Sequence, residues 1–511
     1  MSADGVRLPQ SGGDFGAEDP FPPIPASYSL RRLLAFSLML NRAIGVLIAF
    51  IAVGAAALLW FAVAAGSPAE TNTPTQGLLL GLWTVFYDTQ APSPRVLLAA
   101  VSLAVLVASA VALLDRRATN KSRRSSNARA TPLAPKLIMA PTRGIFSGPV
   151  TVTVLIPAHN EEASLPLTLT SLLSQSHRPS RIIVVADNCT DDTAMVASAY
   201  GAEVFETVGN TRKKAGALNQ ALVEVLPGQG DNDVVMVMDA DTTLDDGFLE
   251  AAVARFSSDR ALMSVGGLFY GEEGAGLLGQ LQRNEYVRYS REIARRRGRV
   301  FVLTGTASMF RPVALRTIAE NRGVTIPGTN GDVYDTAALT EDNELTIALK
   351  SLGGLMVSPA QCTVVTEIMP QLSHLWRQRL RWQRGALENI GAYGVTLATL
   401  RYWSQQLGIG YSVIALGSFA ALMTLTALSV DTWIWFPFWL GIGGVFIAER
   451  VVSVWQGGWR ARILALALIP EMLYDIFLDI VYVKAIVDLT LGRQAQWNHV
   501  ARQAAPAEVM A

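Results

Sequence analysis

Two aspartates one residue apart, Asp239 and Asp241, follow directly after the run from Asp233 to Met238, which is rich in Val and Met. Carboxylate oxygens are the ligands that Mg²⁺ and Mn²⁺ prefer, and a diphosphate can complete the coordination of such an ion. A metal in this place would offset the negative charge that develops on a phosphate leaving group. A solvated acidic turn produces the same three letters, so Asp-Ala-Asp alone leaves both interpretations open.

The chain around this motif alternates between short β-branched runs and helical stretches. The runs are Thr151 to Ile156, Arg181 to Ala186 and Asp233 to Met238, and the helical stretches are Glu162 to Gln175 and Asp191 to Tyr200. This alternation predicts a mostly parallel sheet with helices on both faces. Ligands of such sheets bind beyond the carboxyl ends of the strands. All three runs end in polar residues, which predicts a nucleotide pocket at one edge of the sheet.

Four side chains near these strand ends are candidates for binding a nucleotide. His159 and Glu161 follow the first strand, Asp187 follows the second, and Lys214 precedes a helical stretch. Asp187 would contact a base, and Lys214 would face a phosphate as a counter-charge. Each also has a local alternative: the acidic residues can cap or stabilise a helix start, and Lys214 can be part of a solvated pair.

Thr340-Glu341-Asp342 opens the helical pattern from Leu345 to Leu352. An acid at a helix start ordinarily caps the helix or interacts with its dipole. As a catalytic base, the carboxylate would take a proton from an acceptor hydroxyl, and partial burial beside other carboxylates would raise its pKa. We expect Asp342 rather than Glu341 to have this role.

The motif Gln-Arg-Leu-Arg-Trp lies in the arginine-rich, tryptophan-containing stretch from His374 to Leu387. As an amphipathic helix, the stretch would lie at the headgroup level of a membrane. Gln378, Arg381 and Trp382 fall at i, i+3 and i+4 and share one helix face. That face can bind a diphosphate through Arg381 and stack a sugar on Trp382.

Hydrophobic segments flank this central region. Residues 43–65 and 96–114 are long enough for transmembrane helices. Basic residues dominate the segment that follows residues 96–114, and Arg31, Arg32 and Arg42 precede residues 43–65. This distribution of positive charge predicts that the N-terminus and the central domain are cytoplasmic. A basic run can also bind nucleic acid, but beside a membrane span topology and contact with lipids explain it better, and we expect no nucleic-acid partner.

The second hydrophobic region comprises residues 407–430 and 432–448, which predict a helical hairpin, and residues 463–491. The last stretch contains several charged residues and is either a further span with an acidic face turned into a bundle or an interfacial helix. We favour the span. No internal repeat with the spacing of a transporter is present, so the membrane part is interpreted as an attachment and a conduit.

The composition agrees with a membrane enzyme. Half of the 511 residues are hydrophobic, and Lys+Arg and Asp+Glu balance at 42 each, so total charge gives no information about a nucleic-acid partner. Two cysteines are too few for a disulfide framework. The predicted organisation is a disordered cytoplasmic tail (1–40), two transmembrane helices with an outer loop (41–115), a basic cytoplasmic linker (116–149), a catalytic domain (150–369), interfacial amphipathic helices (370–404), about three transmembrane helices (405–491) and a tail (492–511).

The motifs, in this order and between these hydrophobic segments, resemble those of the family 2 membrane glycosyltransferases, which include cellulose, chitin, hyaluronan and poly-N-acetylglucosamine synthases. The resemblance covers about Thr151 to Asn389. His159 departs from the Tyr that is common in cellulose synthases. The resemblance implies a GT-A α/β fold inserted between transmembrane α-helices, a UDP-sugar donor, Mg²⁺ or Mn²⁺, and inversion at the anomeric carbon.

The resemblance also implies roles for single residues. His159, Glu161 and Asp187 would help bind the uridine, and Lys214 would lie near the diphosphate. Asp239 would meet the nucleotide and share in the metal site of Asp241. The remaining roles are a general base (Asp342), the diphosphate and acceptor site (Gln378, Arg381, Trp382) and an acceptor pocket (Thr304 to Ser308).

The leading hypothesis is a multi-pass plasma-membrane enzyme that extends a β-linked polysaccharide and translocates it. The first alternative is a non-processive transferase that acts on a lipid carrier, a glycolipid or a cell-envelope glycan. A catalytically inactive scaffold and a transporter without enzymatic activity are further alternatives. The sequence does not name the donor sugar, the linkage, the glycan or lipid-linked acceptor, or an export partner.

Overall fold

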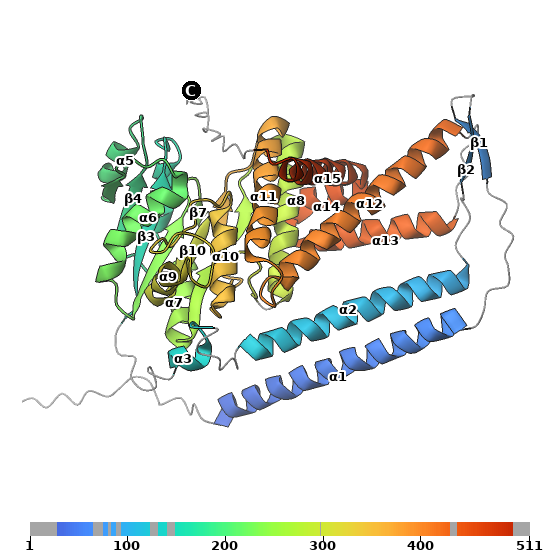
Figure 1. The fold of residues 1–511 in the computed structure, drawn as a ribbon, viewed down its shortest axis with the longest axis horizontal. Coiled ribbons are helices and arrows are strands. Elements are labelled where there is room, and N and C mark those ends of the chain that lie inside the picture. Colours follow the sequence, from blue (N-terminus) through green and yellow to red (C-terminus); the bar gives the residue numbers. More distant parts are fainter. Residues whose placement is uncertain are drawn as a thin grey trace, which may run out of the picture. The chain divides into compact units, whose positions relative to one another are not determined.

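The structure is a computed structural model that describes residues 28–64, 75–79, 83–87, 93–122, 131–139, 149–296, 298–429 and 437–493 (Figure 1). The chain divides into two units, one of residues 1–71 and 92–118 and one of residues 72–91 and 119–511. Each unit is described by itself.

The first unit contains two long helices, α1 (Tyr28–Ala64) and α2 (Pro94–Ser122). Their windows Val46–Ala64 and Pro94–Leu113 both have a mean hydropathy of 2.7 and are long and apolar enough to cross a membrane. The predicted disordered tail of residues 1–40 extends too far, because residues 28–40 belong to helix α1. This segment is rich in Leu and contains Arg31 and Arg32, residue types that favour helix, and it continues into the apolar run without a break. Residues 1–27 lie outside the described part.

The second unit is built on a seven-stranded sheet with the order β11-β8-β10-β6-β3-β4-β5. Its strands are β3 (Thr151–Ala158), β4 (Arg181–Ala186), β5 (Glu203–Glu206), β6 (Asp233–Met238), β8 (Leu262–Gly266), β10 (Ala307–Phe310) and β11 (Leu355–Val357). Only β10 runs antiparallel to its neighbours within this sheet, so the sheet is mostly parallel, as predicted. A second, three-stranded sheet has the order β7 (Thr243–Leu244), β12 (Thr363–Thr366) and β9 (Leu268–Gly271).

Helices cover both faces of the large sheet. Successive residues of a strand point to opposite faces, so Val154 and Ile156 pack with α4 (Leu165–Leu173), α5 (Thr193–Ala199) and α7 (Phe248–Ser258). Leu155 points the other way and packs with α6 (Lys213–Val225), α9 (Pro312–Asn321) and α10 (Glu341–Ser351). Burial on both faces is why these strands read as nearly continuous apolar runs.

The remaining elements of the second unit are mainly helical. They are a hairpin of β1 (Thr75–Leu79) and β2 (Trp83–Tyr87), in the predicted outer loop, and the helices α3 (Pro135–Met139), α8 (Gly276–Arg295), α11 (Leu372–Tyr393), α12 (Leu400–Ser429), α13 (Pro437–Ser453), α14 (Gly458–Ala467) and α15 (Ile469–Thr490). Helix α3 interrupts the segment predicted as a linker.

Helix α12 is the third candidate membrane span among the described residues, with the window Leu400–Leu425. The stretch 463–491, predicted as one helix, is two helices, because Leu468 adopts a left-handed φ of 55° and ends α14. Helix α15 keeps its acid Glu471 buried in an ion pair with Arg288 of α8. The prediction of about three membrane helices in residues 405–491 stays a prediction, and its turn at Asp431 lies outside the described residues.

Candidate active site

The end of β4 holds the carboxylate of Asp187 in a set of protein hydrogen bonds. Its Oδ1 accepts from Thr207 Oγ1 at 2.7 Å, from Asn210 Nδ2 at 2.8 Å and from Asn188 Nδ2 at 3.0 Å. The alternative that Asp187 caps the next helix is wrong, because the carboxylate of Asp191 accepts the first amide of α5. Asp187 is 8% exposed, so its position is fixed by the fold.

The end of β3 lies beside this carboxylate. The ring Nδ1 of His159 is 2.6 Å from the carbonyl oxygen of Asp187, so the two strand ends are joined. The Glu161 carboxylate accepts from Ser164 Oγ at 2.5 Å, and the Glu161 amide donates to Thr193 Oγ1 at 2.8 Å. The structure thus brings His159, Glu161 and Asp187 to one edge of the sheet, as the parallel order predicted.

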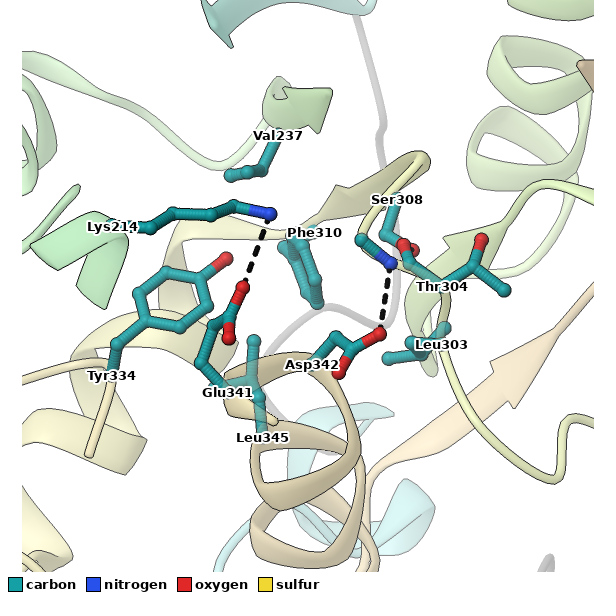
Figure 2. A pocket seen from close by; sticks show the side chains of 11 residues that line it. Lys214, Val237, Leu303, Thr304, Ser308, Phe310, Tyr334, Glu341, Asp342 and Leu345 are labelled. Carbon is teal, nitrogen blue, oxygen red and sulfur yellow. Dashed lines mark hydrogen bonds and ion pairs between the residues drawn. The ribbon is translucent and has the colours of Figure 1, made fainter. Parts of the chain in front are cut away.

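Lys214, in the first turn of α6, joins two of the predicted motifs. Its Nζ is 2.5 Å from Oδ1 of Asp239 and 3.1 Å from Oε1 of Glu341. Burial opposes the charged form, but the nearby carboxylates of Asp239 and Glu341 outweigh it and raise the pKa of Lys214. Figure 2 shows the ammonium group pointing toward Glu341.

Asp241 lies in a crowded acidic environment. Burial, followed by the negative charges of Asp239, Glu161 and Glu367, raises the pKa of Asp241 to about 7. The carboxylate accepts one hydrogen bond, from Thr242 Oγ1 at 3.2 Å. A cation beside it would relieve this repulsion, which is the electrostatic condition of a metal site.

A divalent metal fits this place only together with a substrate. Within the described residues, no group of three or more His, Cys, Asp or Glu side chains is arranged to hold a metal by itself. Mg²⁺ is commonly bound through one or two carboxylates plus substrate phosphates rather than in a protein cage. Asp241 and Asp239 are suited to that kind of binding.

Asp342 lies in the first turn of helix α10 and faces the segment between α8 and β10. Its Oδ2 accepts the Gly305 amide at 3.1 Å. Burial, then the neighbouring charge of Glu341, raises the pKa of Asp342 to about 6. For Glu341, burial is outweighed by Lys214 and Arg381, which lower its pKa. The more basic carboxylate is therefore Asp342, and its role as the catalytic base stays a prediction.

Of the predicted site residues outside the segment 304–308, Lys214 and Asp342 line one small cavity, together with Glu341 (Figure 2). It collects residues from α6, α10, the segment 303–308 and the loop before α10. Its lining residues are Lys214, Val237, Leu303, Thr304, Gly305, Ser308, Phe310, Tyr334, Glu341, Asp342 and Leu345. The segment Thr304 to Ser308, assigned to an acceptor pocket by resemblance, therefore adjoins the two carboxylates of α10.

The three predicted site residues of the motif on helix α11 differ in the contacts that they make. Arg381 acts electrostatically on Glu341 and on Lys213. The Trp382 ring is stacked against the guanidinium of Arg379, 4.2 Å from its centre. Gln378 has its Oε1 buried without a hydrogen-bond partner among the described residues.

Three further side chains were not predicted from the sequence. Arg379, within the motif, is 2% exposed and donates to Glu285 of α8 at 2.8 Å. Tyr334 lines the cavity from a loop that has no periodic pattern. Glu367 raises the pKa of Asp241 from just beyond β12. Only Arg379 had a sequence signal, its place between Gln378 and Arg381.

Comparison with known proteins identifies the domain that carries this site. Residues 153–319 match the model of the family described as Glycosyl transferase family 2. The central domain is a family 2 glycosyltransferase domain. The match spans β3 to α9, and with the mostly parallel sheet it confirms the GT-A-type fold expected from the motifs.

The glycosyltransferase domain is also similar to curated relatives. A poly-beta-1,6-N-acetyl-D-glucosamine synthase of Staphylococcus aureus (strain COL) is 27% identical over 247 residues, which is 46% of this chain and 55% of the relative. The synthase of Staphylococcus epidermidis is 25% identical over 246 residues, with the same coverage. The chain thus spans about half the length of the curated relatives it matches.

Solved structures resemble the glycosyltransferase domain more distantly. A mannosyltransferase from Pyrobaculum calidifontis in complex with GDP-Man and Mn2+ has a TM-score of 0.44 and 16% identity, over 75% of this chain and 99% of the other. A glucosyl-3-phosphoglycerate synthase from Mycobacterium tuberculosis, with Mn2+ and UDP, has a TM-score of 0.31 and 20% identity, over 47% and 80%. The family assignment rests on the sequence matches.

Proposed function

We propose that this chain is a membrane glycosyltransferase that transfers a sugar from a UDP-sugar to a growing β-linked polysaccharide, with inversion at the anomeric carbon. The observation that carries the proposal is that Asp342 and Lys214 line one cavity, with the Lys214 ammonium paired to Asp239. A proton acceptor and a phosphate-binding cation, from motifs about 130 residues apart, lie where one donor and one acceptor can meet.

In this reaction Asp342 accepts the proton of the acceptor hydroxyl while that oxygen forms a bond to the anomeric carbon of the donor. The bond from that carbon to the diphosphate breaks, and UDP leaves with the electron pair. A pKa of about 6 suits the role, because Asp342 is ionised at neutral pH yet basic enough to take a proton. The Gly305 amide holds the carboxylate in place.

The donor would bind along the strand ends. His159, Glu161 and Asp187 would contact the uridine, with Asp187 preset by its three hydrogen bonds. Asp239 and Asp241 would hold Mg²⁺ or Mn²⁺ with the diphosphate, and the ion would neutralise charge on the leaving group. Lys214 and Arg381 would supply further positive charge when UDP forms.

In the proposal, helix α11 contacts the growing glycan and helix α12 spans the membrane. Gln378 and Trp382 would line the acceptor side, next to the candidate span Leu400–Leu425. Positive charge on the flanks of the first two spans favours a multi-pass plasma-membrane protein with its catalytic domain in the cytoplasm. The similarity to poly-beta-1,6-N-acetyl-D-glucosamine synthases supports repeated addition, and the candidate membrane helices would provide the route for translocation of the product.

The test uses the full chain in lipid nanodiscs, with each UDP-sugar and either Mg²⁺ or Mn²⁺. We expect UDP release with one donor, dependent on the metal, and a product of many sugar units. A product that carries a single added sugar and extracts into organic solvent would instead support a transferase acting on a lipid or glycan once. No UDP release with any donor, by a protein that still binds UDP, would overturn the proposal.

A further inference from the structure

Helix α10 holds the segment 301–305 along one of its sides. Asp342, Thr346 and Lys350 lie at i, i+4 and i+8 and so share one stripe of the helix. Each bonds to the backbone of the segment. The bonds run from Gly305 N–H to Asp342 Oδ2 (3.1 Å), from Leu303 N–H to Thr346 Oγ1 (2.8 Å) and from Lys350 Nζ to the Phe301 carbonyl (2.8 Å).

The stripe ends in a compact cluster around Lys350. Its Nζ is 2.5 Å from the hydroxyl of Tyr402, which itself donates to the Phe301 carbonyl at 2.6 Å. The ring centres of Phe301 and Tyr402 are 4.6 Å apart, and Nζ of Lys350 lies 4.6 Å from the centre of the Tyr402 ring. Lys350 thus fastens the start of the segment by a hydrogen bond. Burial lowers the pKa of Lys350 to about 7, and the charged form adds a cation–π contact.

Tyr402 belongs to the first turn of α12, whose window Leu400–Leu425 is apolar enough to cross a membrane. Its side chain is 3% exposed and packs with Ile347 of α10 and Ile390 of α11. The contact therefore joins the candidate membrane helix to α10, which carries Asp342 in its first turn.

The far end of the segment reaches the cavity of the site. A Cβ placed on Gly305 would be 3.2 Å from Lys214 Nζ and 3.4 Å from Asp239 Oδ2. Such close spacing means that a small shift of the segment changes the distance between the base and the phosphate-binding groups.

We propose that Lys350 is a positioning residue, which ties the segment 301–305 to α10 and to the start of α12 and so sets the place of Asp342 relative to the donor. The inference rests on the proposed transferase activity. It also makes the geometry of the site depend on how α12 is held in the membrane.

The first test compares Lys350→Met with Lys350→Arg in the full chain in nanodiscs. A misplacement on the order of 1 Å at a reacting group can lower a rate about 10²-fold. We expect Lys350→Met to lower kcat at least about tenfold while the KM for the donor stays within about twofold. Lys350→Arg keeps a cation and a donor for the Phe301 carbonyl, so it should restore most of kcat.

Arg316→Met is the matched control, because Arg316 also donates to two backbone carbonyls, those of Leu226 and Gln229, away from the cavity. Tyr402→Phe is a milder second variant that removes only the hydroxyl. It should lower kcat in the same direction as Lys350→Met. Unchanged kcat in both Lys350→Met and Tyr402→Phe, or a loss no greater than in Arg316→Met, would overturn the inference.

Amide hydrogen exchange separates this inference from the proposed function, since it needs no activity. Exchange at Leu303 and Gly305 should accelerate in Lys350→Met and not in Arg316→Met. Unchanged exchange at both amides contradicts the positioning role even if the enzyme is active. If the wild-type protein is inactive and Lys350→Met still accelerates exchange, the proposed function is wrong, but the structural coupling between Lys350 and the segment 301–305 is supported.

Discussion

The two sides of the site differ in how their carboxylates are satisfied. On the donor side, at the ends of β3 and β4, Asp187 accepts three hydrogen bonds from protein groups. On the transfer side, Asp342 and Asp241 are crowded by other carboxylates, and burial raises the pKa of each. On the side proposed for the donor, protein hydrogen bonds satisfy the Asp187 carboxylate, whereas on the side proposed for the transfer step burial and neighbouring negative charges disfavour the ionised carboxylates.

This difference indicates where binding and where chemistry take place. A preset, hydrogen-bonded carboxylate recognises a ligand without changing its own protonation state. A carboxylate whose ionised form is disfavoured gains most when a cation arrives or when it accepts a proton. Mutations on the two sides should therefore affect different kinetic constants.

The largest effect is expected on the transfer side, for Asp342→Asn. The amide has nearly the same shape but cannot accept the proton, so kcat should fall on the order of 10³-fold. Binding of UDP, measured by calorimetry, should be retained. Glu341→Gln is the neighbouring control and should lose much less activity. Equal losses in the two variants would contradict the choice of Asp342 as the base.

The next largest effect is expected for Asp241→Asn, which weakens the site for the metal. We expect kcat to fall about 10²-fold at fixed Mn²⁺ and to recover in part when Mn²⁺ is raised, because the ion is held by fewer charged oxygens. Asp246→Asn changes an exposed acid nearby and serves as the control. Activity that is unaffected by chelation in the wild-type protein would rule out the metal site.

The pH dependence of kcat gives a further test of the role of Asp342 on the transfer side. Because Asp342 works in its ionised form, kcat should fall about tenfold per pH unit below a pKa of about 6 and level off above it. Glu341 raises the pKa of Asp342, so Glu341→Gln should move this acidic limb to lower pH. Profiles measured at saturating metal report Asp342 without the titration of Asp241. An acidic limb that stays in place in Asp342→Asn would assign it to another group.

The smallest effect is expected on the donor side, for Asp187→Ala. Loss of one charged contact to the base should raise the KM for the UDP-sugar about tenfold and leave kcat within about twofold. Asp192→Ala, an exposed substitution at the start of α5, is the control. A fall in kcat without a change in KM would mean that the two sides are not separate.

Much of the fold was predictable because its signals are local. The strands β4 and β6 have the predicted bounds, since an apolar run that ends in Asp fixes both the strand and its end. Helix α10 begins at the Glu341 that opens the predicted pattern. The break between α14 and α15 was missed because the apolar run continues unbroken across Leu468, although Pro470 in the first turn of α15 is a signal of a helix boundary.

The site divides in the same way. The sequence determined the candidates for the chemistry, because Asp-Ala-Asp, Thr-Glu-Asp and Gln-Arg-Leu-Arg-Trp are local patterns with definite chemical capacity. Their charge states were decided by the tertiary structure alone. Burial and neighbours from distant segments, such as Lys214 against Asp239 and Glu341, set the pKa values of the carboxylates. The link from Asp342 through Lys350 to Tyr402 likewise arises only when α10 and α12 pack together, because interactions across such sequence distances are a product of folding.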